Sequence, residues 1–201
     1  MMKPVVVLLI CLSYATLRYI VFGDVAIEQW PVFIVNKSVS FFVAACMAAS
    51  AYCSWRLKRI GLLNAISSDE LYSKFEAKQS AMWGRWAWHA LILHVLLSIG
   101  LLNPAYFAKF YDGAKLNLLG NIMLLAGALG SYAFYRLQSE RLNNLIKVLA
   151  CLALLGHLLP MYSSWASPEK WPAYFPPISL LSALLASFAA IGFYQSSRSP
   201  L

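Results

Sequence analysis

The chain has 201 residues, of which 61% are hydrophobic and 12% are charged, and it carries a formal net charge of +8. A soluble domain has about twice this fraction of charge, and the apolar residues here stand in long runs, which excludes an ordinary soluble protein. The basic residues fall between those runs, as they do in the loops of membrane proteins, so the net charge does not indicate a nucleic-acid partner.

Because a spanning helix needs about 20 residues, the chain predicts a single all-α domain, a bundle of six transmembrane helices over residues 1–201. The spans are expected at about residues 4–22, 30–55, 83–102, 116–135, 145–162 and 176–194. Little of this length is left for a flavin or nicotinamide domain, and neither a GxGxxG nor a Walker pattern occurs.

The first two predicted spans each contain a basic residue. The start of the first span resembles a signal peptide with a cleavage site at residues 13–15, but the apolar run continues to Phe22, which favours a retained helix. Arg18 lies in this span and Lys37 lies in the second. Charges inside a span are costly and usually face a partner or a cavity, although long basic side chains near a helix end also reach the headgroups. The residues leave both interpretations open.

The later spans show weaker local signals. Ser67 and Glu70 have capping-box spacing, which predicts a short surface helix over residues 67–82 before the third span. Aromatic residues after the third and fifth spans are typical of membrane interfaces. The fourth span offers small faces for close helix packing at three glycines: Gly120, Gly127 and Gly130. The four cysteines form no CxxC pair and are interpreted as packing residues: Cys11, Cys46, Cys53 and Cys151.

The basic residues outside the spans are divided unequally between the two faces of the predicted bundle. One face has three of them: Lys109, Lys115 and Lys170. The other face has eleven: Lys3, Arg56, Lys58, Arg59, Lys74, Lys78, Arg85, Arg136, Arg141, Lys147 and Arg198. The positive-inside rule therefore predicts that both termini are cytoplasmic.

Two predicted spans carry a histidine at a similar depth. At a helical rise of about 1.5 Å per residue, His94 lies roughly 12 Å and His157 roughly 8 Å below the outer ends of their spans. Imidazole is the usual axial ligand of a haem clamped between two helices, so the pair is a candidate haem site. The alternative is two unrelated histidines that form hydrogen bonds between helices. His89 lies on another face of its helix and is interpreted as a helix-contact residue.

This pattern resembles the ferric reductase-like transmembrane domain, a six-helix haem module. The resemblance covers most of the chain and depends on a few landmarks: Trp83-Gly84 before His94, Leu142-Asn143-Asn144-Leu145 before His157, and the stretch from Gly23 through Asn36-Lys37-Ser38. Family members with two haems have a second histidine on each helix, and the corresponding positions here are near Ser80 and Asn143. The resemblance therefore implies one haem near the outer face and no inner haem.

Together these observations predict a membrane b-type cytochrome of the bacterial inner membrane. His94 and His157 would be the axial ligands of haem b, with Arg18 and Lys37 as candidate partners of its propionates. Electrons would pass from quinol or a redox protein to an acceptor on the periplasmic side, and whether the chain is an enzyme by itself is left open. The alternatives are a haem-free scaffold subunit of a larger complex and a small transporter.

Overall fold

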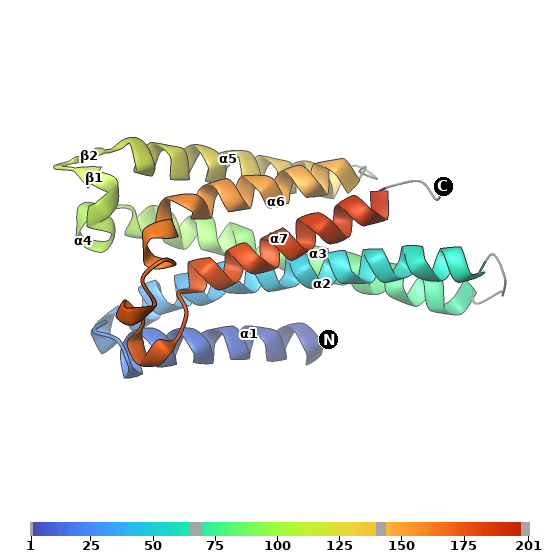
Figure 1. Cartoon of the computed structure of the whole chain (residues 1–201), viewed down its shortest axis with the longest axis horizontal. Coiled ribbons are helices and arrows are strands. Elements are labelled where there is room, and N and C mark those ends of the chain that lie inside the picture. Colours follow the sequence, from blue (N-terminus) through green and yellow to red (C-terminus); the bar gives the residue numbers. More distant parts are fainter. Residues whose placement is uncertain (1, 65–69, 140–143, 198–201) are drawn as a thin grey trace.

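The computed structural model describes residues 2–64, 70–139 and 144–197, and nearly all of these residues lie in helices. Figure 1 shows long helices that run roughly side by side. The α-helices of the described residues are α1 (Met2–Thr16), α2 (Val35–Asn64), α3 (Glu70–Leu101), α4 (Pro104–Phe107), α5 (Leu118–Ser139), α6 (Asn144–Leu158) and α7 (Ile178–Ser197).

Short elements link or extend these helices. The only strands among the described residues are β1 (Tyr111–Asp112) and β2 (Lys115–Leu116), which form a small antiparallel hairpin. The π-helical turns cover Leu17–Val21 and Trp30–Ile34, and the 3₁₀ turns cover Ile27–Gln29, Ala108–Phe110, Leu159–Ser164, Pro168–Lys170 and Pro172–Tyr174.

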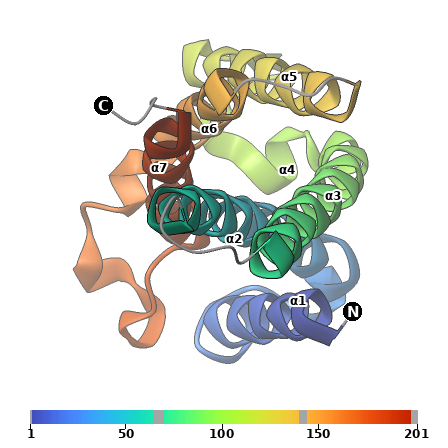
Figure 2. The ribbon, with the colours of Figure 1, turned by 90° about the vertical axis from the view of Figure 1, so that its right-hand side faces the viewer.

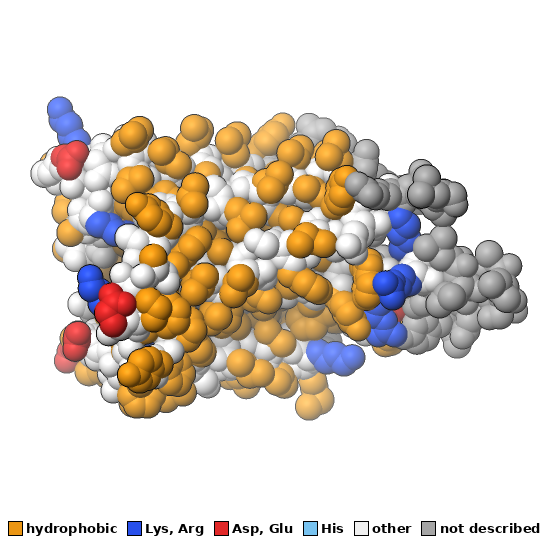
Figure 3. Space-filling view, in the orientation of Figure 1, with side chains coloured by type: hydrophobic (Ala, Val, Ile, Leu, Met, Phe, Trp, Pro, Cys, Tyr) orange, Lys and Arg blue, Asp and Glu red, His pale blue; other side chains and the backbone are white. Residues whose placement is uncertain are grey.

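Within the described ranges, five helical stretches are long and apolar enough to cross a membrane. They are Met2–Val21, Ile27–Arg59, Leu118–Tyr135, Leu145–Ser164 and Pro172–Ser197. A sixth is reached if Lys74–Leu101 and Pro104–Phe110, which are bent by 102° at the break between them, count as one broken span. Figure 3 agrees with this class, because a band of hydrophobic side chains separates the charged groups at the two ends. The fold is that of a helical membrane protein.

One predicted boundary is wrong. The expected surface helix over residues 67–82 is not separate from the third span, because α3 continues unbroken from Glu70 to Leu101. Ser67 of the proposed capping box lies outside the described residues. Helix α2 continues to Asn64, beyond residue 55, where its membrane span was predicted to end. Basic residues mark the membrane boundary but are good helix formers, so they do not end a helix.

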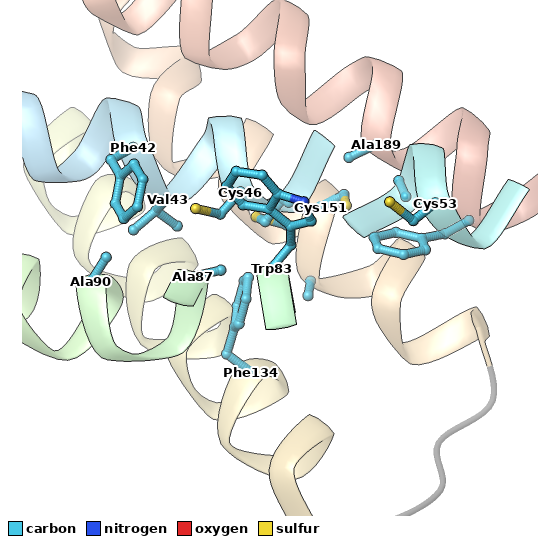
Figure 4. Close-up of a cluster of buried hydrophobic side chains, with 14 of the residues drawn as sticks. Phe42, Val43, Cys46, Cys53, Trp83, Ala87, Ala90, Phe134, Cys151 and Ala189 are labelled. Atoms are coloured by element: carbon cyan, nitrogen blue, oxygen red, sulfur yellow. The ribbon is translucent and has the colours of Figure 1, made fainter. Parts of the chain in front are cut away.

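Helix α2 is at the centre of the bundle, with α1, α3 and α7 packed around it (Figure 2). Small residues bring α7 close, since a Cβ added at Gly192 would lie 3.2 Å from the Cβ of Ala51. Figure 4 shows the hydrophobic core, to which α5 and α6 also contribute Phe134 and Cys151, with the indole of Trp83 among buried aliphatic, aromatic and thiol groups. All four cysteines are free and buried, which confirms that they are packing residues.

The rest of the bundle is a second unit made of α5 and α6, which pack on each other and join the first through α7. Gly130 belongs to this contact, because its added Cβ would lie 3.5 Å from the Cβ of Ala153. Helix α3, in contrast, meets α5 at only a few positions. Figure 2 shows α3 standing apart from α5 and α6, with α4 visible between them at the far end.

A line of polar contacts joins α2 to α3 in the half of the bundle near the termini. The Ser80 hydroxyl lies 3.1 Å from the Ser50 hydroxyl and 2.9 Å from the Ser54 hydroxyl. One turn further along, a guanidinium nitrogen of Arg56 lies 3.3 Å from a carboxylate oxygen of Glu76, which is 4% exposed. These contacts close the seam between the two helices.

Breaking this ion pair from its basic side should destabilise the bundle. Arg56→Gln would leave the Glu76 carboxylate buried without its cation, at a cost of about 1–3 kcal/mol. The double variant Arg56→Gln with Glu76→Gln should recover most of that loss, because no unpaired charge remains. Thermal unfolding of the purified protein in detergent measures both. A double variant as unstable as Arg56→Gln alone would contradict the charge argument.

Candidate functional site

The structure brings His94 of α3 and His157 of α6 together across the side of the bundle where α3 stands apart. Their ring centroids are 6.3 Å apart, and the ring planes are nearly perpendicular at 85°. Both side chains are only half-buried although both lie well inside the bundle. The two predicted ligands therefore face each other from helices that otherwise do not pack closely.

Helix α2 holds the imidazole of His94 through Asn36, which is 2% exposed. The Nδ1 atom of His94 lies 2.7 Å from Oδ1 of Asn36. The Asn36 amide nitrogen donates to the Ser98 hydroxyl at 3.2 Å, one turn along α3. Since a carboxamide oxygen only accepts, Nδ1 of His94 must carry the proton, and the lone pair of the neutral ring is on Nε2.

His157 is held in the same way by a backbone carbonyl. Its Nδ1 atom lies 2.9 Å from the carbonyl oxygen of Met123 on α5, so this ring also has its proton on Nδ1 and its lone pair on Nε2. Gly127, one turn further along α5, leaves room for the ring, because an added Cβ would lie 3.0 Å from Nδ1. Residue 127 therefore has to be small for His157 to reach this carbonyl.

Lys37 lies beside the pair at the end of the bundle away from the termini. Its ammonium is 5.3 Å from the ring centre of Phe33 and 5.1 Å from that of Phe107, which comes from α4 after the bend. Lys37 directly follows Asn36, whose side chain contacts His94. Of the two basic residues predicted for the site, Lys37 thus belongs to the same segment of α2 as a contact of His94.

Arg18 belongs to a different set of contacts. It is 6% exposed, its guanidinium donates to the carbonyl oxygen of Phe175, and it lies 5.3 Å from the ring centre of Tyr19. The neighbouring Tyr14 hydroxyl donates to the carbonyl of Pro176 at 2.7 Å. Arg18 and Tyr14 therefore fasten the segment before α7 to α1, and the role of Arg18 toward a propionate stays a prediction.

The expected role of His89 is wrong. Its side chain is exposed on the outside of α3, and its Nδ1 atom lies 2.8 Å from the carbonyl oxygen of Arg85 in its own helix. It therefore makes no helix-to-helix contact of the kind expected. Ser80 and Asn143 stand near the positions where two-haem family members have a second histidine. Ser80 lies in the α2–α3 seam, and Asn143 lies outside the described residues.

The chemistry open to this arrangement follows from its donors. Among the described residues, no three His, Cys, Asp or Glu side chains gather closely enough to hold a metal ion by themselves. Two facing imidazoles, each with a free Nε2 lone pair, instead suit a metal whose remaining ligands come from elsewhere, such as a tetrapyrrole. A transporter path is favoured by a broken helix, and the break between Leu101 and Pro104 lies about two turns beyond His94.

Three contributors to the site were missed from the sequence. Asn36 was noted only as a landmark, the Met123 carbonyl has no sequence signal, and Gly127 was interpreted as a helix-packing residue. The amide of Asn36 inside an apolar helix was the one usable signal, because a buried carboxamide needs a hydrogen-bonding partner.

Comparison with known proteins does not assign the chain to a family. No protein-family model matches it, and no curated protein has a similar sequence. The class defined by the fold, a helical membrane protein, is therefore supported by the structure alone.

Of the two polar neighbours of His94, Asn36 should contribute more to stability than Ser98. Asn36→Leu keeps the branched shape of the side chain but leaves Nδ1 of His94 without its 2.7 Å acceptor, so it should lower the free energy of unfolding by about 1–3 kcal/mol. Ser98→Ala removes contacts of 3.2, 3.3 and 3.4 Å, all longer than the 2.7 Å contact, and should cost less. Thermal unfolding in detergent measures both variants, and equal losses would contradict the assignment.

Proposed function

We propose that the chain is a membrane b-type cytochrome with one haem held between His94 and His157. The observation that carries the proposal is the facing of these two imidazoles, 6.3 Å apart, inside an apolar bundle. Each ring is fixed at Nδ1 by a hydrogen bond to a neighbouring helix, which leaves its Nε2 atom available to a bound group.

The distance supports bis-imidazole ligation. A bond from a metal to an imidazole nitrogen is about 2 Å long, and a ring centre lies a further bond length beyond, so two rings on opposite sides of one metal have centres roughly 6 Å apart. Perpendicular ring planes are compatible with this, because rotation about each metal–nitrogen bond leaves the bond unchanged. The ring separation of 6.3 Å agrees with that value.

Each residue near the histidine pair would have a distinct role in such a site. His94 and His157 would bind the iron through Nε2, while Asn36 and the Met123 carbonyl keep the protons on Nδ1 and fix the ring orientations. Lys37 would offset the negative charge of a propionate. The haem supplies a reversible one-electron carrier, and the apolar helices keep water from it.

The membrane placement completes the proposal. The chain would cross the bacterial inner membrane six times, with α3 and its bent continuation as one span and with both termini in the cytoplasm. Two observations support this: the start of α1 and the end of α7 lie at the same end of the bundle in Figure 1, and most of the basic residues outside the predicted spans belong to that side. Electrons would come from quinol or a redox protein and leave at the periplasmic side.

A single haem is proposed because no histidine stands at the inner position. The resemblance would place a second haem ligand near Ser80, and the Ser80 hydroxyl lies 3.1 Å from the Ser50 hydroxyl and 2.9 Å from the Ser54 hydroxyl of α2. A serine held in this way at the α2–α3 seam does not offer iron an ordinary ligand.

The direct test is the absorption spectrum of protein purified from cells supplied with haem. The reduced-minus-oxidised spectrum should show b-type bands, which His94→Ala and His157→Ala should each abolish. His89→Ala is the matched control, because this histidine is on the same helix but faces outward, and it should keep the bands. Protein without b-type bands would refute the cytochrome and favour the scaffold alternative, while bands retained in both ligand variants would refute the ligands.

A glycine pair tests the space around the site. Gly127→Val should reduce haem retention, because its side chain would displace His157 from the Met123 carbonyl. Gly100→Val makes the same change in α3 at a position with no atom within 4 Å of the added Cβ, and it should retain haem. Haem content per protein measures both, and normal retention in Gly127→Val would argue against this geometry.

Redox titration can distinguish the roles of Lys37 and Arg18. Lys37→Gln should lower the midpoint potential of the haem, because a positive charge near the site favours the reduced state. Arg18→Gln should leave the potential nearly unchanged if its guanidinium serves only the Phe175 carbonyl. A lowered potential in Arg18→Gln would restore the predicted propionate role of Arg18.

A further inference from the structure

Helix α3 carries a shallow recess at the border between its outward face and the core, against which Met82 and Trp86 pack. Its lining residues are Met82, Arg85, Trp86 and His89, which recur every three or four residues and so share one helix face. Arg85 and His89 are exposed, whereas the helix buries Trp83 and Ala87 against the core. The recess therefore opens toward the surrounding membrane.

Charge is segregated between the two faces of this helix. Lys74 and Lys78 are exposed on the same outward face, about three and two turns before Arg85. Glu76 lies on the opposite face, buried against Arg56 of α2. The outward face near the recess is thus cationic, and anionic groups are its natural partners.

The same face becomes apolar farther along the helix. Leu93 and Leu96, one and two turns beyond His89, are 45% and 62% exposed. A cationic stretch followed by an exposed apolar stretch on one helix face matches the two parts of a phospholipid, a charged headgroup and its acyl chains.

Depth places the recess at the level of the headgroups. Sixteen residues separate Arg85 from the end of α3 at Leu101, which is roughly 24 Å at helical rise, whereas the hydrocarbon core of a bilayer is about 30 Å thick. Side chains on a helix point back toward its N-terminus, so the Arg85 guanidinium reaches the opposite membrane surface.

We propose that this recess binds the anionic headgroup of a phospholipid in the leaflet at the end of the bundle where both termini lie. The Arg85 guanidinium pairs with the phosphate through charge-assisted hydrogen bonds. The Trp86 indole and Nε2 of His89 offer two more contacts, since Nδ1 of His89 is already bonded to the Arg85 carbonyl. The acyl chains lie along Leu93 and Leu96. The site is independent of the proposed haem.

Native mass spectrometry of the purified full chain tests this binding. The protein is mixed with phosphatidylglycerol or with phosphatidylcholine of the same acyl chains, and the bound lipid is counted. The unmodified chain should retain the anionic lipid preferentially. In Arg85→Gln with His89→Gln, retention of phosphatidylglycerol should fall about five- to tenfold, while Arg85→Lys, which keeps the charge, should lose less.

Arg59→Gln is the matched control, because Arg59 is an exposed cation at the same end of the bundle, 4.3 Å from the ring centre of Trp55 on α2. It should retain phosphatidylglycerol like the unmodified chain. Circular dichroism and gel filtration establish that each variant is folded. Equal retention of the two lipids, unchanged retention in the double variant, or an equal loss in Arg59→Gln would overturn the proposal.

Discussion

Polar groups inside an apolar bundle need partners from another helix, and this constraint sets the register between α2 and α3. Three polar pairings run along the two antiparallel helices: Asn36 with His94, Ser50 with Ser80, and Arg56 with Glu76. In each pair the two residue numbers add up to nearly the same value, as antiparallel pairing requires. A slip of one helix by one turn would break all three at once, so the depth of His94 is fixed by contacts far from it.

The position of His157 depends on contacts with other helices than α2 and α3. His157 depends on α5, through the Met123 carbonyl and the space beside Gly127. The α5–α6 pair reaches the central helix through α7, on the side away from the histidines. The bundle is therefore closed by packing along one side, while on the other side the two imidazoles face each other across helices that barely touch.

The sequence supported the class of fold because apolar runs of membrane length have few other structures open to them. It also paired His94 with His157, since depth in a membrane can be counted along a helix. It failed on the helix between residues 67 and 82, where a polar surface pattern concealed an unbroken continuation of α3. The predicted helix contact of His89 was wrong because one sequence does not identify the neighbours that decide which side of a helix faces the core. The carbonyl that holds His157 had no signal, since every residue has one.

The unbroken length of α3 has a mechanical consequence. Its 32 residues exceed what a bilayer core requires, and together with the end of α2 it extends past the other helices at the end of the bundle near the termini (Figure 1). A straight helix without a proline between Glu70 and Leu101 behaves as a stiff rod. Because α2 and α3 are held in register, a force applied to their projecting ends would act on His94 through both helices, whereas His157 is on the shorter α6. The separation of the two rings would then report on any load carried by that end.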